Sequence, residues 1–361
     1  MKKKILISTG GSGGHVVPAT ILYEQLKCQF QVSISTDNRG IKFLDKNKYN
    51  FEVFNVTPIS KNIFLLPLQF FTIIYLIIES ILFLRKRKID ILISTGGYMS
   101  LPLCLASKFL NIKLFLFEPN MVLGRANKFF IKFCEKIFCY SDKIKNFPAK
   151  YINKINIIPS LLRKEFYEIE KAKNINGHVN LLVIGGSQGA MIFDKLIKTS
   201  IIELSKKYNF KVYQQTNPFN FENLKKFYKD NNINHELFDY NEKISNLMSK
   251  ANICLTRAGA STLAELVFLN LPFVAIPLPT SKDNHQFENA FFYNKIGCNW
   301  ILNQNEIDDK TIINMLTNIV DNKDEYLIKK MNMKNFSFQN TWNNINQKII
   351  SVINENRISK N

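Results

Sequence analysis

The chain has 361 residues, more than one ordinary hydrophobic core needs, and this length predicts two domains. Apolar residues make up 46% of it without a Pro/Ser/Gly-rich tract, which excludes a largely disordered chain. The formal charge of +19 favours anionic partners, but no basic stripe interleaved with aromatic residues accompanies it, which argues against nucleic acid. Six scattered cysteines without a C-x-x-C pair argue against a zinc site or a disulfide framework and indicate a reducing cytoplasm.

Short apolar strands alternate with helical patterns along the first half. The first strand, Ile5-Leu6-Ile7, is followed by a glycine-rich stretch and then by a helical pattern. Further strands are predicted at 32–34, 89–93, 113–117 and 136–140. Strands that alternate with helices are typical of a parallel α/β sheet.

The second half restarts the same pattern. Its predicted strands are 181–184, 210–213, 253–256 and 273–277, and the first of them again ends in glycines. We therefore expect two Rossmann-like, doubly wound parallel-sheet domains, 1–158 and 159–335, joined near Pro159. A polar C-terminal helix, about 336–361, is expected to pack back on the first domain. Ligands of such sheets bind at the carboxyl ends of the strands.

A long apolar segment runs from Ile63 to Leu84 and ends in the basic cluster 85–88. A bilayer-spanning helix needs about 20 apolar residues, so length alone permits one. However, Pro67, Gln69 and Glu79 interrupt the segment, and a strand pattern follows it at once. We expect a helix that packs on the sheet while its apolar face and basic cluster, within 63–88, contact an anionic membrane surface.

The stretch GGSGGHVVPA at 10–19 places a histidine directly after four glycines. A glycine turn between a strand and a helix exposes backbone N–H groups that suit a phosphate, although it can equally serve only close packing. The stretch matches neither a Walker loop nor a dinucleotide fingerprint. His15 lies where the sheet's ligands are expected, which favours a functional role over a buried structural one.

Six motifs, in this order and spacing, resemble the MurG family of bacterial glycosyltransferases. They are GGSGGHVVPA (10–19), STGGYMSLP (94–102), FEPNMVLGRAN (117–127), GGSQGA (185–190), TRAGASTLAEL (256–266) and DNHQFENA (283–290). The resemblance implies a GT-B fold, with the two domains facing across a cleft. It also implies inverting transfer of N-acetylglucosamine (GlcNAc) from UDP-GlcNAc to the 4-hydroxyl of N-acetylmuramic acid (MurNAc) in lipid I, which gives lipid II for peptidoglycan.

The resemblance also implies partners and a place in the cell. The substrates would be UDP-GlcNAc and lipid I, and other cell-wall synthesis proteins are further candidate partners. The enzyme would lie peripherally on the cytoplasmic face of the bacterial inner membrane. The first domain would bind the acceptor and the membrane, and the second would bind the donor.

Donor contacts follow from the resemblance, each with a physical reason. A carboxylate at Glu265 can accept both ribose hydroxyls, and Arg163 can offset diphosphate charge. Ile244 would offer backbone groups to uracil, and small hydroxyls and loop amides suit the diphosphate. The implied donor contacts are Arg163, Ser187, Gln188, Ile244, Ala260, Ser261, Thr262, Leu263, Ala264, Glu265 and Gln286.

Displacement at the anomeric carbon needs one base and a stabilised UDP leaving group, but no covalent nucleophile. His15 is the expected base, because its ordinary pKa of about 6.5 suits the task; Glu118 is the alternative. Expected acceptor-side contacts are Ser12, Gly13, Gly14, Tyr98 and Asn120. No Asp-x-Asp pair occurs, so the sequence predicts neither a catalytic metal nor a cofactor.

Three stretches depart from the family pattern. The run before Arg163 differs, the loop at 277–281 is one residue longer than a common version, and Gln214-Gln215-Thr216-Asn217 stands where many relatives carry His-Gln-x-Gly. Three other functions stay open: a diacylglycerol glycosyltransferase of the same fold, a UDP-sugar epimerase, and a UDP-sugar sensor without catalysis.

Overall fold

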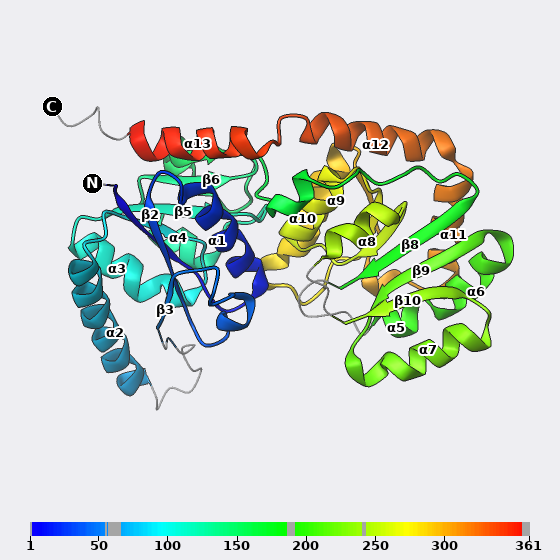
Figure 1. Ribbon diagram of the computed structural model, residues 1–361, viewed down its shortest axis with the longest axis horizontal. Helices are drawn as coiled ribbons and strands as arrows, with labels where there is room; N and C mark the ends of the chain where they lie inside the picture. Colours follow the sequence, from blue (N-terminus) through cyan, green and yellow to red (C-terminus); the bar gives the residue numbers. More distant parts are fainter. Residues whose placement is uncertain (1, 55, 57–65, 186–191, 240–242, 356–361) are drawn as a thin grey trace. The chain divides into compact units, whose positions relative to one another are not determined.

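The computed structural model describes residues 2–54, 56, 66–185, 192–239 and 243–355 (Figure 1). The chain divides into two compact units. The first unit consists of Met1–Leu161 together with Thr341–Asn361, and the second of Leu162–Asn340. Within the described residues each unit contains one sheet, and every pair of neighbouring strands is parallel.

The sheet of the first unit has the strand order β3-β2-β1-β4-β5-β6-β7. Its strands are β1 (Lys4–Ser8), β2 (Gln31–Thr36), β3 (Phe51–Val53), β4 (Ile91–Ser94), β5 (Lys113–Glu118), β6 (Lys136–Cys139) and β7 (Ile155–Ile157). In β1, Ile5, Leu6 and Ile7 are all fully buried, because helices cover both faces of a parallel sheet. The strand order reverses between β1 and β4, the position at which such sheets bind ligands.

Five α-helices are described in the first unit: α1 (Gly13–Leu26), α2 (Leu66–Arg87), α3 (Leu101–Phe109), α4 (Arg125–Phe130) and α13 (Trp342–Glu355). Helix α2 packs on α3, and α13 packs on α1 (Figure 1). The buried residues of α13, Ile345, Ile349, Val352 and Ile353, recur at helical spacing on one face. The Gln25 side chain on α1 donates a hydrogen bond to the Trp342 carbonyl.

The sheet of the second unit has the order β10-β9-β8-β11-β12-β13. These strands are β8 (His178–Ile184), β9 (Asn209–Gln215), β10 (Asn234–Phe238), β11 (Ile253–Thr256), β12 (Phe273–Ala275) and β13 (Asn299–Ile301). Successive side chains of a strand point to opposite faces, so Leu182 and Ile184 join one hydrophobic core while Leu181 and Val183 join another.

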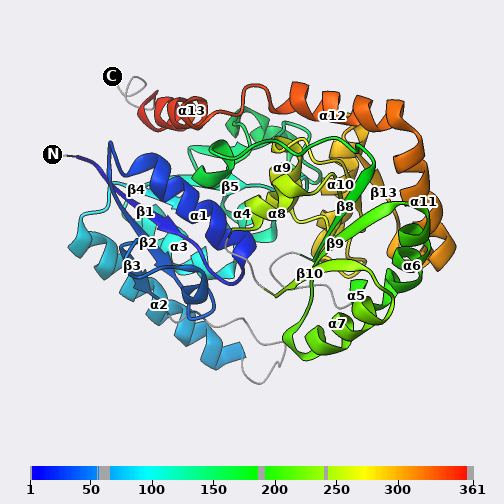
Figure 2. The same ribbon diagram turned by 45° about the vertical axis from the view of Figure 1, so that its right-hand side comes forward.

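Helices lie on both faces of this sheet (Figure 2), and their side chains contribute to the two cores. The first core includes residues of α8 (Ile244–Lys250), α9 (Ala260–Phe268), α10 (His285–Lys295) and α12 (Lys323–Ser337). The second includes residues of α5 (Phe193–Leu196), α6 (Lys198–Lys207), α7 (Phe221–Asp230) and α11 (Asp309–Asp321). The prediction of two parallel α/β domains is therefore confirmed.

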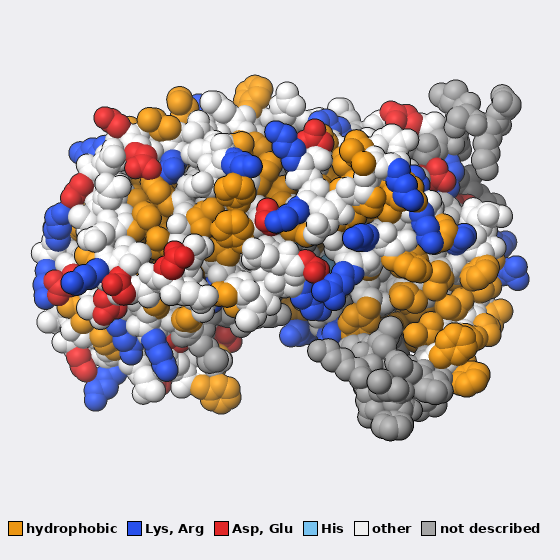
Figure 3. Space-filling view, turned by 180° about the vertical axis from the view of Figure 1, so that it is seen from behind, with side chains coloured by type: hydrophobic (Ala, Val, Ile, Leu, Met, Phe, Trp, Pro, Cys, Tyr) orange, Lys and Arg blue, Asp and Glu red, His pale blue; other side chains and the backbone are white. Residues whose placement is uncertain are grey.

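Helix α2 carries the apolar segment predicted from the sequence, of which residues 63–65 lie outside the described residues. Its buried side is formed by Leu76, Ser80 and Leu84. Among the side chains of α2 that the structure describes, six large apolar ones are exposed: Phe70, Phe71, Ile74, Tyr75, Ile78 and Leu82. Figure 3 shows hydrophobic side chains gathered over this part of the first unit, with Lys and Arg side chains beside them. In the described part of the chain, no helix has the length and hydropathy needed to cross a membrane.

Candidate active site

The loops that follow β1, β2, β4 and β5 meet at the carboxyl edge of the first sheet. Helix α1 begins at Gly13, and its first helical hydrogen bond runs from the Val16 N–H to the Ser12 carbonyl. The amides of Gly13 and Gly14 precede that bond, as the first amides of any helix do. The Ser12 hydroxyl caps none of the described amides of α1. These three residues therefore present polar groups without bulky side chains, as predicted for an anionic ligand.

His15 is oriented by the loop after β4. Its Nδ1 lies 2.8 Å from the Thr95 carbonyl oxygen. A carbonyl only accepts hydrogen bonds, so Nδ1 carries the proton and Nε2 is the unprotonated nitrogen of the neutral ring. The ring packs against Gly96 and Gly97, whose φ angles of 92° and 83° favour glycine. The loop thus holds His15 in the tautomer that can accept a proton at Nε2.

Glu118, at the end of β5, is buried and accepts four hydrogen bonds. Its Oε1 accepts from the backbone N–H (3.2 Å) and the side-chain amide (3.0 Å) of Asn120. Its Oε2 accepts from the Gly124 N–H (2.7 Å) and from Nδ2 of Asn127 (3.0 Å). Four donors suit an ionised carboxylate, which only accepts. This geometry favours a positioning role for Glu118 and leaves His15 as the better placed base.

Asn127 connects these two predicted catalytic residues, a role that its sequence motif does not indicate. Its Nδ2 also donates to the Phe117 carbonyl at 3.0 Å. The same nitrogen lies 3.8 Å from the position that a Cβ on Gly96 would occupy, and the His15 ring lies 3.4 Å from that position. His15 and Glu118 therefore belong to one packed cluster. The only sequence signal was the place of Asn127 at the end of the third motif.

Asp37 and Arg39, which follow β2, were also missed. The Asp37 carboxylate accepts from the N–H groups of Gly11 and Gly40, both at 2.9 Å, and pairs with Arg39 at 2.5 Å. Burial alone would raise the pKa of this carboxyl, but the two N–H donors and the guanidinium hold it below its ordinary value. Arg39 in turn lies 4.9 Å from the ring centroid of Tyr98, one of the predicted acceptor-side residues.

In the second unit, Glu265 and Arg163 lie together. Glu265 on α9 is 8% exposed, and its Oε1 lies 3.5 Å from Nη2 of Arg163. Arg163 also contacts Glu165 at 3.3 Å. Burial raises the pKa of Glu265, although the Arg163 guanidinium opposes this rise. Two carboxylates thus engage the arginine, so any contact of Arg163 with a diphosphate would compete with them.

The start of α9 partly departs from the expected set of donor contacts. The amides of Ala260, Ser261 and Thr262 precede the first helical hydrogen bond, so they point out of the helix end. The Leu263 N–H instead donates to the Gly259 carbonyl at 3.0 Å, and the Leu263 side chain is fully buried. The Leu263 amide is therefore already bonded within the helix, and its predicted contact with the donor stays a prediction. Ala264 is also buried.

Gln286 fixes two loops of the second unit. Its Oε1 accepts from the N–H groups of Ala258 (3.2 Å) and Leu278 (3.0 Å), so a ligand contact would have to use its NH2 group. Asn289, one turn further along α10, donates to the Ala258 carbonyl at 3.1 Å. Asp283 and Asn284, just before α10, both adopt left-handed φ angles near a stretch that departs from the family pattern.

The stretch Gln214–Asn217 forms a polar network that accounts for its departure from the family. Gln214 donates to the buried Asp194 at 2.8 Å and accepts from the Tyr228 hydroxyl. Thr216 and Asn220 also donate to Asp194, at 2.9 and 2.8 Å. The φ of Asn217 is −74°, so this turn needs no glycine. A glutamine can therefore replace the family histidine without leaving Asp194 unpaired.

Ser187, Gln188 and Ile244 are the remaining predicted donor contacts of the second unit. Ser187 and Gln188 lie outside the described residues, so their donor role stays a prediction. Ile244 begins α8 and is partly buried, with its N–H before the first helical hydrogen bond.

Arg257, within the fifth motif, had no assigned role. Its guanidinium donates to the Ile276 carbonyl at 2.9 Å and to Gln304 at 2.6 Å.

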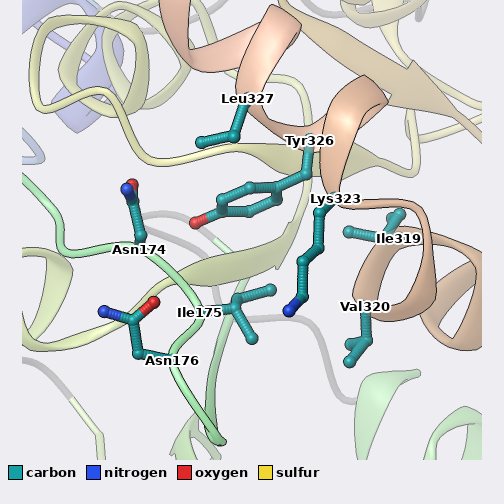
Figure 4. A pocket seen from close by; sticks show the side chains of 8 residues that line it. All are labelled: Asn174, Ile175, Asn176, Ile319, Val320, Lys323, Tyr326 and Leu327. Carbon is teal, nitrogen blue, oxygen red and sulfur yellow. The ribbon is translucent and has the colours of Figure 1, made fainter.

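A pocket elsewhere in the second unit contains no predicted site residue. Side chains from 174–176, α11 and α12 line it (Figure 4). The Tyr326 hydroxyl at this pocket donates to the Asn252 carbonyl at 2.8 Å, so its polar group is already bonded.

Among the described residues, no group of three or more His, Cys, Asp or Glu side chains could hold a metal ion. The prediction of a metal-free reaction stays a prediction.

Two solved structures share the fold. The Acinetobacter baumannii MurG crystal structure matches with a TM-score of 0.77 at 21% identity, covering 98% of this chain and 99% of that one. The UDP-GlcNAc 2-epimerase from Neisseria meningitidis, bound to UDP-GlcNAc, matches with a TM-score of 0.67 at 15% identity, covering 98% of this chain and 100% of that one. Likeness at such identities shows the fold alone.

Sequence comparisons are more specific. The glycosyltransferase family 28 N-terminal domain matches residues 5–139, and the C-terminal domain of that family matches residues 180–348. A UDP-N-acetylglucosamine–N-acetylmuramyl-(pentapeptide) pyrophosphoryl-undecaprenol N-acetylglucosamine transferase of Pelagibacter ubique (strain HTCC1062) is 65% identical over 356 residues, 99% of this chain and 100% of that relative. The chain therefore belongs to glycosyltransferase family 28 and, within it, to the MurG family of N-acetylglucosaminyltransferases.

Proposed function

We propose that this chain transfers GlcNAc from UDP-GlcNAc to the 4-hydroxyl of MurNAc in lipid I, with inversion at the anomeric carbon. The product is lipid II, a precursor of peptidoglycan. The observation that carries the proposal is the 65% identity, along 99% of the chain, to a relative named for this transfer. The site supports it, because it offers a base that can accept a proton in one unit and a buried carboxylate suited to a ribose in the other.

In this mechanism the first unit binds the acceptor. Asn120 and Tyr98 hold the acceptor beside the loop Ser12–Gly14, and Nε2 of His15 takes the proton of the attacking hydroxyl. The new bond forms at the anomeric carbon as its bond to the UDP oxygen breaks. The Thr95 carbonyl accepts the Nδ1 proton, so Nε2 is the nitrogen of the neutral ring that can take the proton, and Glu118 fixes Asn120 through two hydrogen bonds.

The second unit binds the donor. Glu265 accepts hydrogen bonds from the ribose, and the first amides of α9 face the charge that develops on the departing UDP. Arg163 adds positive charge 3.5 Å from Glu265. Ser187, Gln188, Ile244 and Gln286 complete the proposed donor contacts. These groups stabilise the leaving group without a metal ion.

The test is transfer of labelled GlcNAc from UDP-GlcNAc to a lipid I analogue, with EDTA or with Mg²⁺. We expect β-linked product in both conditions. Diacylglycerol as acceptor tests the lipid-glycosylating alternative, and UDP-GlcNAc alone tests epimerisation. Donor binding without transfer to any acceptor, even with Mg²⁺, would support the sensor and contradict the proposal.

The same proposal places the enzyme peripherally on the cytoplasmic face of the inner membrane. The exposed apolar side chains lie along α2. At its C-terminal end follow the basic residues Arg85, Lys86, Arg87 and Lys88, all of which are exposed. An apolar face suits the acyl boundary, and a basic cluster suits anionic head groups. Lipid I is itself membrane-anchored, so this face would hold the acceptor-binding unit against its substrate.

Vesicle co-sedimentation tests the membrane contact. We expect Leu82→Glu to weaken binding to vesicles that contain anionic lipid, because it places a charge in the apolar face. Phe219→Glu is the matched control, since Phe219 is 96% exposed but lies on the second unit, outside α2. Equal binding by wild type, Leu82→Glu and Phe219→Glu would contradict the role of α2.

A further inference from the structure

Arg39 is held in place by three loops of the first unit. Its Nε and Nη2 donate to Oδ2 of Asp37, at 3.0 and 2.5 Å. Its guanidinium lies 4.9 Å from the ring centroid of Tyr98, in the loop after β4. On a third side it lies against Gly11, where an added Cβ would stand 3.3 Å from Nη2. The arginine is therefore oriented before any ligand arrives.

Asp37 provides this orientation and also fixes the glycine loop. The residue is only 3% exposed, and its Oδ1 accepts from the Gly11 and Gly40 N–H groups. Gly10 lies so close that an added Cβ would stand 2.9 Å from Oδ1, so only glycine fits there. The Gly11 amide, bonded to Asp37, is thus already used within the protein. Anion binding at this loop therefore depends on other groups.

Arg39 can supply the missing positive charge. Its side chain is 47% exposed although three loops contact it. The bonds to Asp37 use Nε and Nη2, which directs the Nη1 edge of the planar guanidinium away from the carboxylate. A guanidinium held in this way matches the geometry of phosphate oxygens, and the adjacent start of α1 also favours an anion. Asp37 is buried while Arg39 is half exposed, so the carboxylate holds the guanidinium in place and leaves it accessible to a ligand.

We propose that Arg39 contacts a diphosphate oxygen of the acceptor bound at Ser12–Gly14, and that Asp37 is a positioning residue for it. This inference rests on the proposed function, in which the acceptor carries a diphosphate. It adds a charged contact on the acceptor side, where the sequence analysis found only glycines, a serine, a tyrosine and an asparagine. Arg39 neutralises the acceptor and does not take part in proton transfer.

The kinetic test compares Arg39→Gln with wild type and with Lys27→Gln. Lys27 is a matched control, because it is 46% exposed, belongs to the same unit and also forms an ion pair, with Glu24. We expect Arg39→Gln to raise the KM for the lipid I analogue by roughly 10- to 100-fold, as expected for loss of a charge-assisted hydrogen bond, and to leave the KM for UDP-GlcNAc unchanged. Arg39→Lys should lie between, since lysine keeps the charge but not the planar fork.

A binding test separates this inference from the proposed function. Inorganic pyrophosphate is titrated into each variant with saturating UDP present, so that the donor site is occupied. We expect wild type and Lys27→Gln to bind the probe equally and Arg39→Gln to bind it at least about 10-fold more weakly. Equal binding by Arg39→Gln and wild type, or no binding by wild type, would overturn the role of Arg39. Absence of transfer by wild type would instead contradict the proposed function.

An outcome in which Arg39 is only a structural clamp is also recognisable. Arg39→Gln would then lower the unfolding temperature and raise both KM values together. Asp37→Asn is a second test variant. It keeps the shape of the side chain but weakens the ion pair that orients Arg39. We expect it to raise the acceptor KM alone, by less than Arg39→Gln does. Equal changes in both KM values for these two variants would overturn the proposal.

Discussion

The two units hold their ligand-edge loops with different chemical groups. In the first unit carboxylates accept the loop amides: Asp37 accepts from Gly11 and Gly40, and Glu118 from Gly124. In the second unit, neutral side-chain amide oxygens accept the N–H groups of the loops. Gln286 accepts from Ala258 and Leu278, and Gln215 accepts from Gly185 at 3.0 Å. The two units share a parallel α/β architecture. Charged side chains accept the loop amides in the first unit, and neutral side chains accept them in the second; we call these side chains anchors.

This difference fits the proposed ligands. A neutral anchor adds no negative charge beside a nucleotide diphosphate, whereas an anionic anchor would repel it. In the first unit the charge of Asp37 is offset by Arg39, and that of Glu118 is spread over four hydrogen bonds. We therefore expect substitutions in the first unit to change kcat or the acceptor KM, and substitutions in the second to change the donor KM.

The largest effect is expected from His15→Ala. Loss of the general base should lower kcat by about 10²- to 10⁴-fold, the usual contribution of proton transfer by a positioned side chain. The KM for UDP-GlcNAc should stay unchanged, because His15 belongs to the first unit. The measurement is transfer at saturating acceptor and donor. His178→Ala, at the exposed start of β8, is the control. A wild-type kcat in His15→Ala would rule out His15 as the base.

Glu118→Gln should have a smaller effect on kcat and a clear effect on stability. Its NH2 group would face the donors of Gly124 and Asn127, so we expect the free energy of unfolding to fall by about 1–3 kcal/mol. The remaining kcat should stay well above that of His15→Ala, because His15 is still present. Glu79→Gln on the exposed side of α2 serves as control. A fall in kcat as large as that of His15→Ala would identify Glu118 as the base.

Glu265→Gln should act on the donor. We expect the KM for UDP-GlcNAc to rise roughly 10-fold, as for loss of a hydrogen bond to a charged group. Burial raises the pKa of Glu265, so this carboxylate protonates at a higher pH than an exposed glutamate does. The wild-type donor KM should therefore rise as pH falls, and this dependence should be weaker in Glu265→Gln. An identical pH dependence in both proteins would argue against a donor contact.

The same shift makes a prediction about stability. Because the pKa of Glu265 is raised on folding, the folded state binds more protons than the unfolded state between the two pKa values. This contribution to stability is present at low pH and is lost as pH rises through that interval. Glu265→Gln should therefore not destabilise the protein at neutral pH, as measured by urea unfolding. A large loss there would mean that Glu265 chiefly supports the fold.

The smallest effect on activity is expected from Gln214→Leu. It leaves the Tyr228 hydroxyl and one oxygen of Asp194 without this partner, so the free energy of unfolding should fall by about 1–3 kcal/mol. Tyr228→Phe removes one of the same hydrogen bonds, so the double variant should lose less than the sum of the two. Strict additivity in urea unfolding would show that the network does not couple these residues.

The sequence predicted the interior strands of both sheets but missed every described edge strand. The interior strand β1 contains a buried apolar run, whereas β3 (Phe51–Val53) and β10 (Asn234–Phe238) are partly exposed and include polar residues. Strands β7 and β13, at the other two edges, are three residues each. An edge strand pairs on one side only, so it needs no long apolar pattern.

Motifs carried the predictions for His15, Glu118 and Glu265, which lie in glycine-rich or family-like stretches. The structure places them after β1, at the end of β5 and on the helix after β11, and their roles stay predictions. Asp37 and Arg39 were missed, because they lie in an ordinary turn after β2 and their contacts join residues far apart in the chain. The Gln214 network was missed for the same reason, since its partners lie on α5 and α7.

In the proposed function the first unit activates the acceptor while the second binds the donor. Calorimetric titration of UDP-GlcNAc into wild type, His15→Ala and Glu265→Gln separates these two roles. We predict that His15→Ala binds the donor as wild type does and that Glu265→Gln binds it roughly 10-fold more weakly. Weakened donor binding by His15→Ala, together with wild-type affinity in Glu265→Gln, would contradict this division.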